Sequence, residues 1–153
     1  SEEVADVLRW KGIRGPAQYF PLPFDDSTPQ ELPVPENQVF RLGYLGRITE
    51  DKGISLLLRA LDELHREGFP FRLVVGGAGE LVTEVTARPY VTYLGLVPHN
   101  RSHTFYQQID CFVLPSQTRA HWKEQFGRVI VESFGAGKPV IGSSSGSIPE
   151  VLG

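Results

Sequence analysis

A chain of 153 residues is long enough for one domain with its own hydrophobic core. Apolar residues make up 41% of it and charged residues 22%, which excludes a largely disordered chain, and its apolar runs are far shorter than the ~20 residues of a membrane span. The formal net charge of −3 gives no support to general nucleic-acid binding, and the single cysteine excludes an internal disulfide and a cysteine-based zinc site.

The first 37 residues differ in composition from the rest of the chain. A short helix is predicted over 2–10 and a strand over 17–22, and five of the twelve prolines lie between positions 21 and 35. Proline removes backbone donors and favours extended geometry in the residue before it, so 23–37 is interpreted as a semi-rigid linker. Residues 1–22 are too few to bury a core alone, so we expect them to pack on something else.

From residue 38 onward, short apolar strands alternate with helices. The stretch 52–67 has the apolar spacing of an amphipathic helix, and Ser147 with Glu150 three residues later has the pattern of a capping box that begins another helix. This alternation predicts βαβ units, and therefore an α/β fold with a doubly wound parallel sheet. The expected buried face of the 52–67 helix is Leu56, Leu57, Ala60, Leu61 and Leu64. The predicted strands are 39–45, 71–75, 91–94, 111–114 and 139–141, and the other predicted helices are 102–108 and 128–136.

Charged residues and glycines follow the predicted strands, at the edge where parallel sheets bind their ligands. Arg47 follows the first strand and Lys52 begins the next helix; two cations beside a helix start suit a diphosphate, although solvated loop cations are the common alternative. The glycine-rich run at 76–79 predicts either a tight turn or a close approach of a ligand to the backbone. It is not the dinucleotide-binding fingerprint, because Val82 stands where that motif needs glycine.

Two glutamates flank the point where a loop is expected to become a helix. With Gly127 at that junction, Glu124 lies in the loop and Glu132 on the helix, where the two carboxylates could accept hydrogen bonds from two different polyols. Solvated surface glutamates are the alternative. His99 and His103 have i,i+4 spacing but lack a neighbouring third ligand, so we expect no metal site.

Several blocks of the sequence together resemble one enzyme family. They follow the family's order and spacing through residues 38–153, and the most specific is the stretch from Glu124 to Glu132 that leads into Gly135–Gly142. On these blocks the chain resembles the group-1 (family 4) retaining glycosyltransferases. The other blocks are Phe40–Arg47 with Lys52-Gly53, Phe71–Gly79, Asp110–Ser116 and Gly146–Leu152.

The resemblance implies the GT-B architecture, in which two Rossmann-like domains face each other across a cleft. It implies that 38–153 is the nucleotide-sugar donor-binding domain, truncated at its C-terminus, with 1–22 the end of the N-terminal acceptor domain and 23–37 the linker. The expected activity is metal-independent, retaining transfer of a hexose from a nucleotide sugar, without a further cofactor. The expected partners are the donor, an acceptor sugar, lipid or other hydroxyl compound, and the protein's own N-terminal domain, and the isolated fragment is expected to be inactive. With a single cysteine, we expect a cytoplasmic location that includes the inner face of the membrane.

The resemblance also implies roles for individual residues. Arg47 and Lys52 match the pair that clamps the donor diphosphate, and Glu124 matches the carboxylate at the transferred sugar; these three are the expected catalytic set. Glu132 matches the carboxylate that accepts hydrogen bonds from the ribose. The other expected donor-binding residues are Gly46, Gly76, Val97, Phe126, Gly127 and Arg128, the last three through their backbone N–H groups.

Two other functions remain open at the level of sequence. A nucleotide-sugar epimerase of the same architecture would bind a similar ligand, but it would be expected to carry more carboxylates and histidines around the sugar. A non-catalytic nucleotide-sugar-binding module would be expected to have lost Arg47, Lys52 or Glu132, and all three are present.

Overall fold

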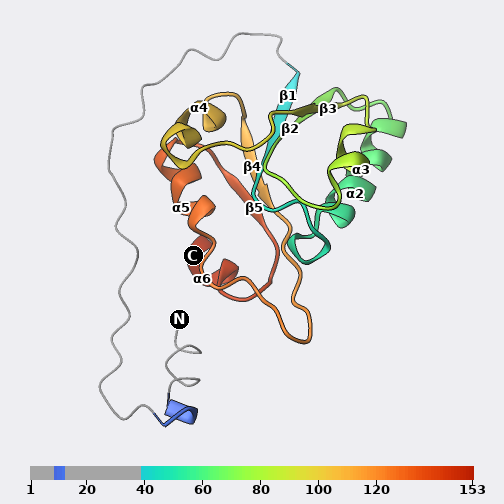
Figure 1. Ribbon diagram of the computed structural model, residues 1–153. Helices are drawn as coiled ribbons and strands as arrows, with labels where there is room; N and C mark the ends of the chain where they lie inside the picture. Colours follow the sequence, from blue (N-terminus) through green and yellow to red (C-terminus); the bar gives the residue numbers. More distant parts are fainter. Residues whose placement is uncertain (1–8, 13–38) are drawn as a thin grey trace.

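In the computed structural model, which describes residues 9–12 and 39–153, one parallel sheet lies between two layers of helices (Figure 1). The strand order is β3-β2-β1-β4-β5, and every neighbouring pair is parallel. The strands are β1 (Phe40–Leu45), β2 (Phe71–Gly76), β3 (Val91–Tyr93), β4 (Cys111–Leu114) and β5 (Val140–Gly142). The helices are α2 (Ile54–Arg66), α3 (Val82–Thr86), α4 (Ser102–Tyr106), α5 (Arg128–Gly135) and α6 (Ile148–Leu152), with 3-10 turns at Glu50–Lys52 and His99–Arg101.

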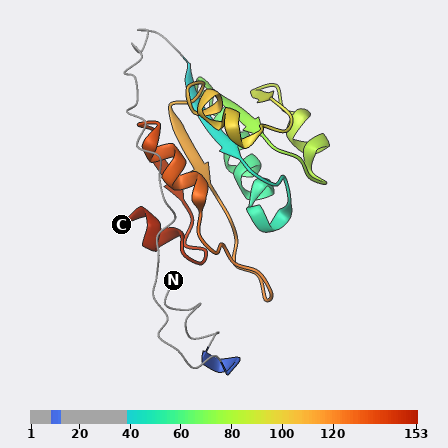
Figure 2. The same ribbon diagram turned by 60° about the vertical axis from the view of Figure 1, so that its left-hand side comes forward.

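The predicted doubly wound α/β fold is confirmed, because helices cover both faces of the sheet. Helices α2 and α3 lie on one face, and α4, α5 and α6 lie on the other, as the turned view in Figure 2 also shows. Each face has its own apolar cluster, one around Leu58 and Leu73 and the other around Phe112 and Ile130. Burial on both faces explains why the central strands β1, β2 and β4 have largely apolar sequences, whereas the edge strands β3 and β5 are only partly buried.

Helix α2 begins later than the sequence predicts, and its buried face is rotated. Gly53, at φ 73°, ends the preceding 3-10 turn, so the helix starts at Ile54 rather than at residue 52. The buried residues are Ile54, Leu57, Leu58 and Leu61. Leu56, Ala60 and Leu64, expected in the core, are exposed.

Two other details differ from the sequence prediction. Helix α3 was not predicted, because five residues with one buried side chain, Val85, are too short to show a helical period. The capping box is wrong: Ser147 precedes α6, but its side chain makes no capping hydrogen bond. Of the elements predicted before residue 38, only the last two residues of the 2–10 helix are described, and they are helical; the 17–22 strand and the 23–37 linker lie outside the described residues.

The glycine-rich turn after β2 is explained by contacts between backbones. The loops after β1 and β2 are joined by hydrogen bonds from the N–H of Gly46 to the Gly76 carbonyl (3.0 Å) and from the N–H of Ile48 to the Ala78 carbonyl (2.9 Å). At Gly77, whose φ is 139°, a Cβ would overlap the Gly46 carbonyl oxygen. The glycine therefore allows two loops to lie against each other, as the tight-turn interpretation requires.

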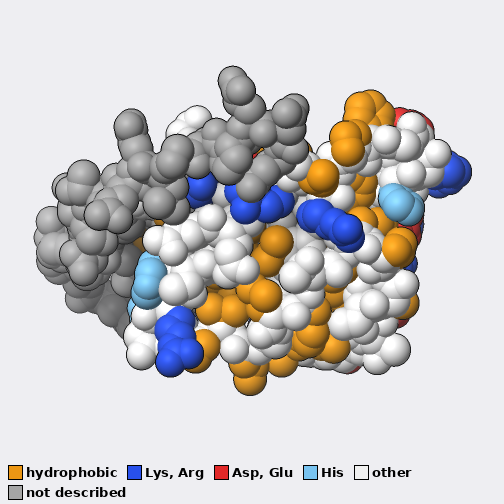
Figure 3. Space-filling view, turned by 90° about the horizontal axis from the view of Figure 1, so that it is seen from above, with side chains coloured by type: hydrophobic (Ala, Val, Ile, Leu, Met, Phe, Trp, Pro, Cys, Tyr) orange, Lys and Arg blue, Asp and Glu red, His pale blue; other side chains and the backbone are white. Residues whose placement is uncertain are grey.

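The surface over the amino ends of the strands carries side chains of more than one kind. Viewed from above, over the amino ends of the strands, hydrophobic and basic side chains are interspersed (Figure 3). Val39, Phe40 and Phe69 are among the exposed hydrophobic residues at this end. Ligands of such folds bind at the opposite edge, beyond the carboxyl ends of the strands, and the interlocked loops lie there.

We expect the fold to lose stability as acid protonates Asp110. Burial raises the pKa of Asp110, but hydrogen bonds from the Arg41 side chain (2.9 and 3.2 Å) and the Arg41 backbone N–H (2.8 Å) outweigh it, so the pKa lies below its ordinary value. A carboxyl whose folded-state pKa is lowered stabilises the protein above its unfolded-state pKa of about 4, and this stabilisation disappears as the pH falls through the lower folded-state value.

Asp110→Asn should therefore lose about 1–2 kcal/mol of unfolding free energy at pH 7, where Asp110 is ionised, and less at pH 3. Urea unfolding between pH 3 and pH 7 measures this difference. If the variant and the parent lost stability in parallel over this range, Asp110 would not be a source of the acid sensitivity.

Candidate functional site

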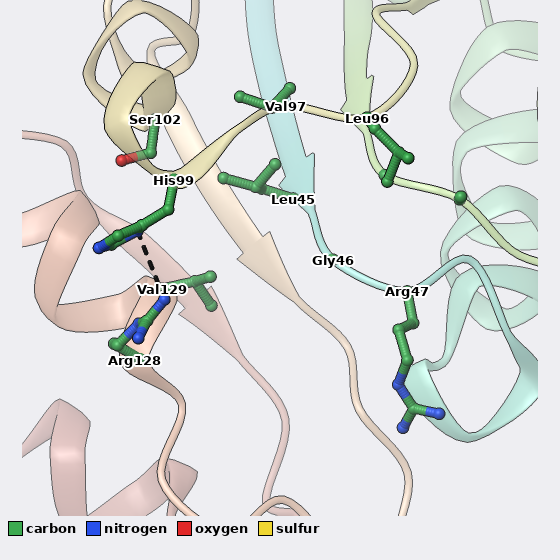
Figure 4. Close-up of a pocket in the computed structure, with 11 residues that line it drawn as sticks. Leu45, Gly46, Arg47, Leu96, Val97, His99, Ser102, Arg128 and Val129 are labelled. Atoms are coloured by element: carbon green, nitrogen blue, oxygen red, sulfur yellow. Dashed lines mark hydrogen bonds between the residues drawn. The ribbon is translucent and has the colours of Figure 1, made fainter.

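A pocket of about 400 Å³ lies at the carboxyl ends of the first three strands. The loops after β1, β2 and β3 form one part of its wall, and the starts of α4 and α5 form the other (Figure 4). The lining residues are Leu45, Gly46, Arg47, Gly77, Ala78, Leu96, Val97, His99, Ser102, Arg128 and Val129. The pocket therefore opens where a doubly wound sheet is expected to take its ligand.

The pocket combines an apolar surface with two cationic side chains. Leu45, Val97 and Val129 supply apolar surface, whereas His99 and Arg128 point toward each other on one side of the pocket and Arg47 lies on the other (Figure 4). Nη2 of Arg128 lies 3.4 Å from Nδ1 of His99. Such a lining suits a ligand that has both a flat, weakly polar part and an anionic part.

Arg47 is held at the pocket by a local network of hydrogen bonds. Its Nη2 donates to Oδ2 of Asp51 (2.8 Å), and the Thr49 hydroxyl donates to the other oxygen of the same carboxylate (2.5 Å). Burial raises the pKa of Asp51, but the hydrogen bond from Thr49 and the charge of Arg47 outweigh it, so the pKa lies below its ordinary value. The Arg47 side chain remains 59% exposed, so the guanidinium can offer its other donors to an anion.

Lys52 and Glu124 form an ion pair, although 72 residues separate them in the sequence. Nζ of Lys52 donates to Oε2 of Glu124 (2.7 Å), and the Ser116 hydroxyl donates to the same oxygen (2.8 Å). The ammonium nitrogen of Lys52 also lies over the Trp122 ring, 4.7 Å from the ring centroid. Only 17% of the Lys52 side chain and 12% of the Glu124 side chain are exposed, so an anion that reaches Lys52 must compete with a partly buried carboxylate.

The backbone of Glu124 is fixed by the loop that precedes α6. The N–H of Ser147 donates to the Glu124 carbonyl (3.0 Å), and the Ser147 hydroxyl lies 3.4 Å from the same oxygen. Gly146, at φ 57°, lies so close that a Cβ would overlap this carbonyl oxygen. The loop from Ser143 to Ser147 thus positions the carboxylate that pairs with Lys52.

Glu132 is bound at both of its carboxylate oxygens. Oε1 accepts a hydrogen bond from Nε of Arg128 (3.1 Å), one helical turn earlier on α5, and lies 3.7 Å from Nδ1 of His99. Oε2 lies 3.2 Å from the Tyr106 hydroxyl. Because Arg128 and His99 line the pocket, the Glu132 carboxylate adjoins it without forming its wall.

The structure brings some of the predicted site residues together and separates others. Gly46, Arg47, Val97 and Arg128 line the pocket. Gly76 lies beneath it, where a Cβ would come within 2.8 Å of both Leu45 and Val97. The Lys52–Glu124 pair lies outside the pocket lining, and Phe126 and Gly127 immediately precede α5.

Sequence reasoning missed several residues of this region. His99 was considered only as a metal ligand, and in the described residues no group of three His, Cys, Asp or Glu side chains is placed to hold a metal ion. Leu96, 77% exposed at the pocket, and Trp122 beside Lys52 carry no sequence signal that separates them from ordinary surface residues. Gly146 and Ser147 could have been found from the unusual small-residue loop between β5 and α6.

Within the part of the chain that the structure describes, none of the helices is long and apolar enough to cross a membrane.

Known proteins are similar to this chain in sequence. The profile of the family described as glycosyl transferases group 1 matches residues 26–153. The chain is 34% identical over 141 residues to the lipopolysaccharide 1,2-N-acetylglucosaminetransferase of Salmonella typhimurium, a match that covers 83% of this chain and 36% of that protein. It is 33% identical over 116 residues to an uncharacterized glycosyltransferase of Methanocaldococcus jannaschii, covering 71% of this chain and 28% of that protein.

Solved structures show the same fold. The pneumococcal O-GlcNAc transferase GtfA, in complex with UDP and GlcNAc, is similar with a TM-score of 0.70 at 20% sequence identity. That similarity covers 96% of this chain and 30% of the pneumococcal one. The chain thus spans about a third of the length of the proteins that it matches.

Proposed function

Because the chain belongs to the group 1 glycosyltransferases, we propose that its described domain binds the nucleoside diphosphate (NDP) part of a nucleotide-sugar donor in the pocket beyond β1 and β2. The observation that carries this proposal is the lining itself, in which apolar side chains lie between the guanidinium groups of Arg47 and Arg128. The pneumococcal relative of the same fold, which was solved with UDP and GlcNAc, supports the choice of ligand.

Each part of the donor has a matching group at this edge of the sheet. The base is proposed to lie against the apolar surface that includes Val97, and the ribose to donate to Glu132. The diphosphate is proposed to be bound by Arg47 and Lys52, whose positive charge would stabilise the leaving NDP while the bond to the sugar breaks. Gly46, and the N–H groups of Phe126, Gly127 and Arg128 at the start of α5, are proposed to approach the phosphates and the sugar.

The Lys52–Glu124 ion pair gives donor binding a defined order of contacts. The diphosphate draws the Lys52 ammonium group away from Glu124, because a diphosphate carries more negative charge than one carboxylate. Glu124 is then free to accept hydrogen bonds from the hydroxyl groups of the sugar. The same carboxylate therefore partners Lys52 before the donor binds and the transferred sugar afterwards.

Transfer to an acceptor is proposed to need a second domain. We propose a retaining, metal-independent hexosyl transfer, in which the protein's own N-terminal domain holds an acceptor sugar, lipid or other hydroxyl compound. The described domain alone would bind the donor without transferring the sugar, because holding and orienting the acceptor can contribute as much as ~7–11 kcal/mol to lowering the barrier.

The choice of nucleotide can be tested directly by calorimetry. Titrating the 153-residue chain with UDP, GDP and ADP, and with a sugar conjugate of each, should give saturable binding for one base above the other two. Addition of candidate acceptors to the bound donor should give no transfer product. Absence of binding by every nucleotide would contradict the donor-site assignment, and efficient transfer by this chain would contradict the need for a second domain.

Glu124→Gln should separate the two roles proposed for this carboxylate. Removing its charge removes the competitor for Lys52, so NDP affinity should rise about fivefold, equivalent to ~1 kcal/mol. The preference for the nucleotide sugar over the NDP should fall, because an amide accepts hydrogen bonds from sugar hydroxyls less strongly than a carboxylate. Calorimetry with the NDP and its sugar conjugate measures both changes.

Glu63→Gln, an equivalent charge change on the exposed face of α2, is the matched control and should change neither affinity. A Glu124→Gln variant that lost affinity for both ligands to the same extent would contradict the proposed exchange of partners.

A further inference from the structure

The hydroxyl group of Tyr106 lies beneath Glu132, at a contact that no sequence pattern indicates. Tyr106 is the last residue of α4, only 1% of its surface is exposed, and its hydroxyl oxygen lies 3.2 Å from Oε2 of Glu132. The ring is packed against Phe105 and Phe112, with ring centroids 5.4 and 5.8 Å away. Because the ring is buried and closely packed, it holds the hydroxyl group in one place.

This hydroxyl has one proton and two acceptors within reach. The Val129 carbonyl oxygen also lies 3.2 Å away, but the Glu132 carboxylate is the stronger acceptor because it is ionised. Burial raises the pKa of Tyr106 far above its ordinary value, and the neighbouring Glu132 charge raises it further. The hydroxyl therefore stays protonated and available as a donor.

The two groups bound to Glu132 differ in how easily they can leave it. Arg128, which donates to Oε1, is 58% exposed and lines the pocket, so a diphosphate can attract it away from the carboxylate. Tyr106 is enclosed in the core and cannot follow. When a ligand occupies the pocket, the Tyr106 hydroxyl remains as the fixed partner of Glu132.

We propose that Tyr106 is the positioning residue that orients Glu132 toward the ribose hydroxyl groups of the nucleotide, an inference that rests on the proposed function. Its proton occupies one lone pair of Oε2, which leaves the other lone pairs of the carboxylate for the 2′- and 3′-hydroxyl groups. Tyr106 does not touch the ligand. It acts by holding the carboxylate in the orientation that distinguishes a ribose from a sugar without hydroxyl groups.

The test compares ligands with and without these hydroxyl groups. The probes are the tightest-binding nucleotide among UDP, GDP and ADP, its 2′,3′-dideoxy counterpart and inorganic pyrophosphate, each titrated into the parent chain and into Tyr106→Phe. The parent should prefer the ribonucleotide to the dideoxynucleotide by about tenfold or more, and Tyr106→Phe should lose most of this preference. Pyrophosphate affinity should be the same in both proteins, because pyrophosphate has no ribose.

Tyr90→Phe is the matched control. Tyr90 is also buried, and its hydroxyl also donates to a carboxylate, Oδ1 of Asp62 (2.5 Å), but the pair lies on the other face of the sheet and outside the pocket. Removing this hydroxyl should affect stability without changing the ratio of ribonucleotide to dideoxynucleotide affinity. If the lost preference came only from a less stable fold, both variants would change the ratio of ribonucleotide to dideoxynucleotide affinity to a similar extent.

If Tyr106→Phe does not fold, the hydroxyl proton of Tyr106 in the parent provides the second test by NMR. Its resonance should shift more on saturation with the ribonucleotide than with the dideoxynucleotide, because both ligands can draw Arg128 away but only the first brings ribose hydroxyl groups to Glu132. A folded Tyr106→Phe that keeps the parent's ribose preference, or a hydroxyl resonance that the two nucleotides shift to the same extent or not at all, would overturn the role of Tyr106 while leaving the donor site intact. A parent that binds neither nucleotide nor pyrophosphate would overturn the proposed function and this inference together.

Discussion

Lys52→Ala is expected to weaken NDP binding by about 10- to 100-fold, equivalent to ~1.5–3 kcal/mol for a lost charge-assisted hydrogen bond. The effect has two sources. The variant loses a cation proposed to contact the diphosphate, and it leaves the Glu124 carboxylate, only 12% exposed, without its ion-pair partner. An uncompensated negative charge next to the site repels the incoming diphosphate, so the loss should exceed that of a single exposed contact. Calorimetry with the NDP measures it.

Two further variants separate these sources. In Lys52→Ala combined with Glu124→Gln the unpaired charge is gone, so part of the affinity should return. Lys138→Ala removes the same charge two residues before β5, at the amino end of the sheet, and should leave NDP affinity unchanged. Lys52→Ala with the parent's affinity would mean that the diphosphate is bound elsewhere.

Gly146→Ala is expected to reduce the free energy of unfolding by about 2–4 kcal/mol. The residue has φ 57°, which an alanine adopts only with strain, and its Cβ would overlap the Glu124 carbonyl oxygen. The clash must push apart the two loops that fix Glu124, so the preference for the nucleotide sugar over the NDP should also be lost. Urea unfolding measures the first effect and calorimetry the second.

Gly68→Ala provides the matched control for this variant. Gly68 has φ 83°, but a Cβ there would meet no atom within 4 Å, so its replacement costs about 1–2 kcal/mol of backbone strain without a clash. The difference between the two variants in the free energy of unfolding measures the effect of the contact with Glu124. If both variants lost the same stability and both kept the sugar preference, the loop before α6 would not position Glu124.

The sheet could be predicted from sequence, whereas the pairing of charges could not. Five apolar runs, each followed by turn residues, were sufficient to indicate the parallel strands, because burial on both faces gives the three central strands largely apolar sequences. The Lys52–Glu124 pair joins loops that are 72 residues apart, and no local pattern indicates which carboxylate reaches which ammonium group. Sequence reasoning therefore assigned both residues to one site without predicting that they neutralise each other.

The errors in the sequence prediction have local physical causes. Ser147 has the spacing of a capping box with Glu150, but its N–H and hydroxyl groups face the Glu124 carbonyl instead. A tertiary contact has replaced the local hydrogen bond that the pattern indicates. His99 was judged only as a metal ligand, whereas the turn before α4 brings it to the pocket beside Arg128.

The central claim is that an NDP binds in the pocket at the carboxyl ends of β1 and β2. Mapping the backbone amide resonances of the 153-residue chain during titration with UDP, GDP and ADP tests it most directly. Saturable shifts are expected in the loops at 46–52 and 96–102 and at the start of α5, 126–132. Shifts confined to the amino ends of the strands, or none that saturate with any of the three nucleotides, would contradict the claim.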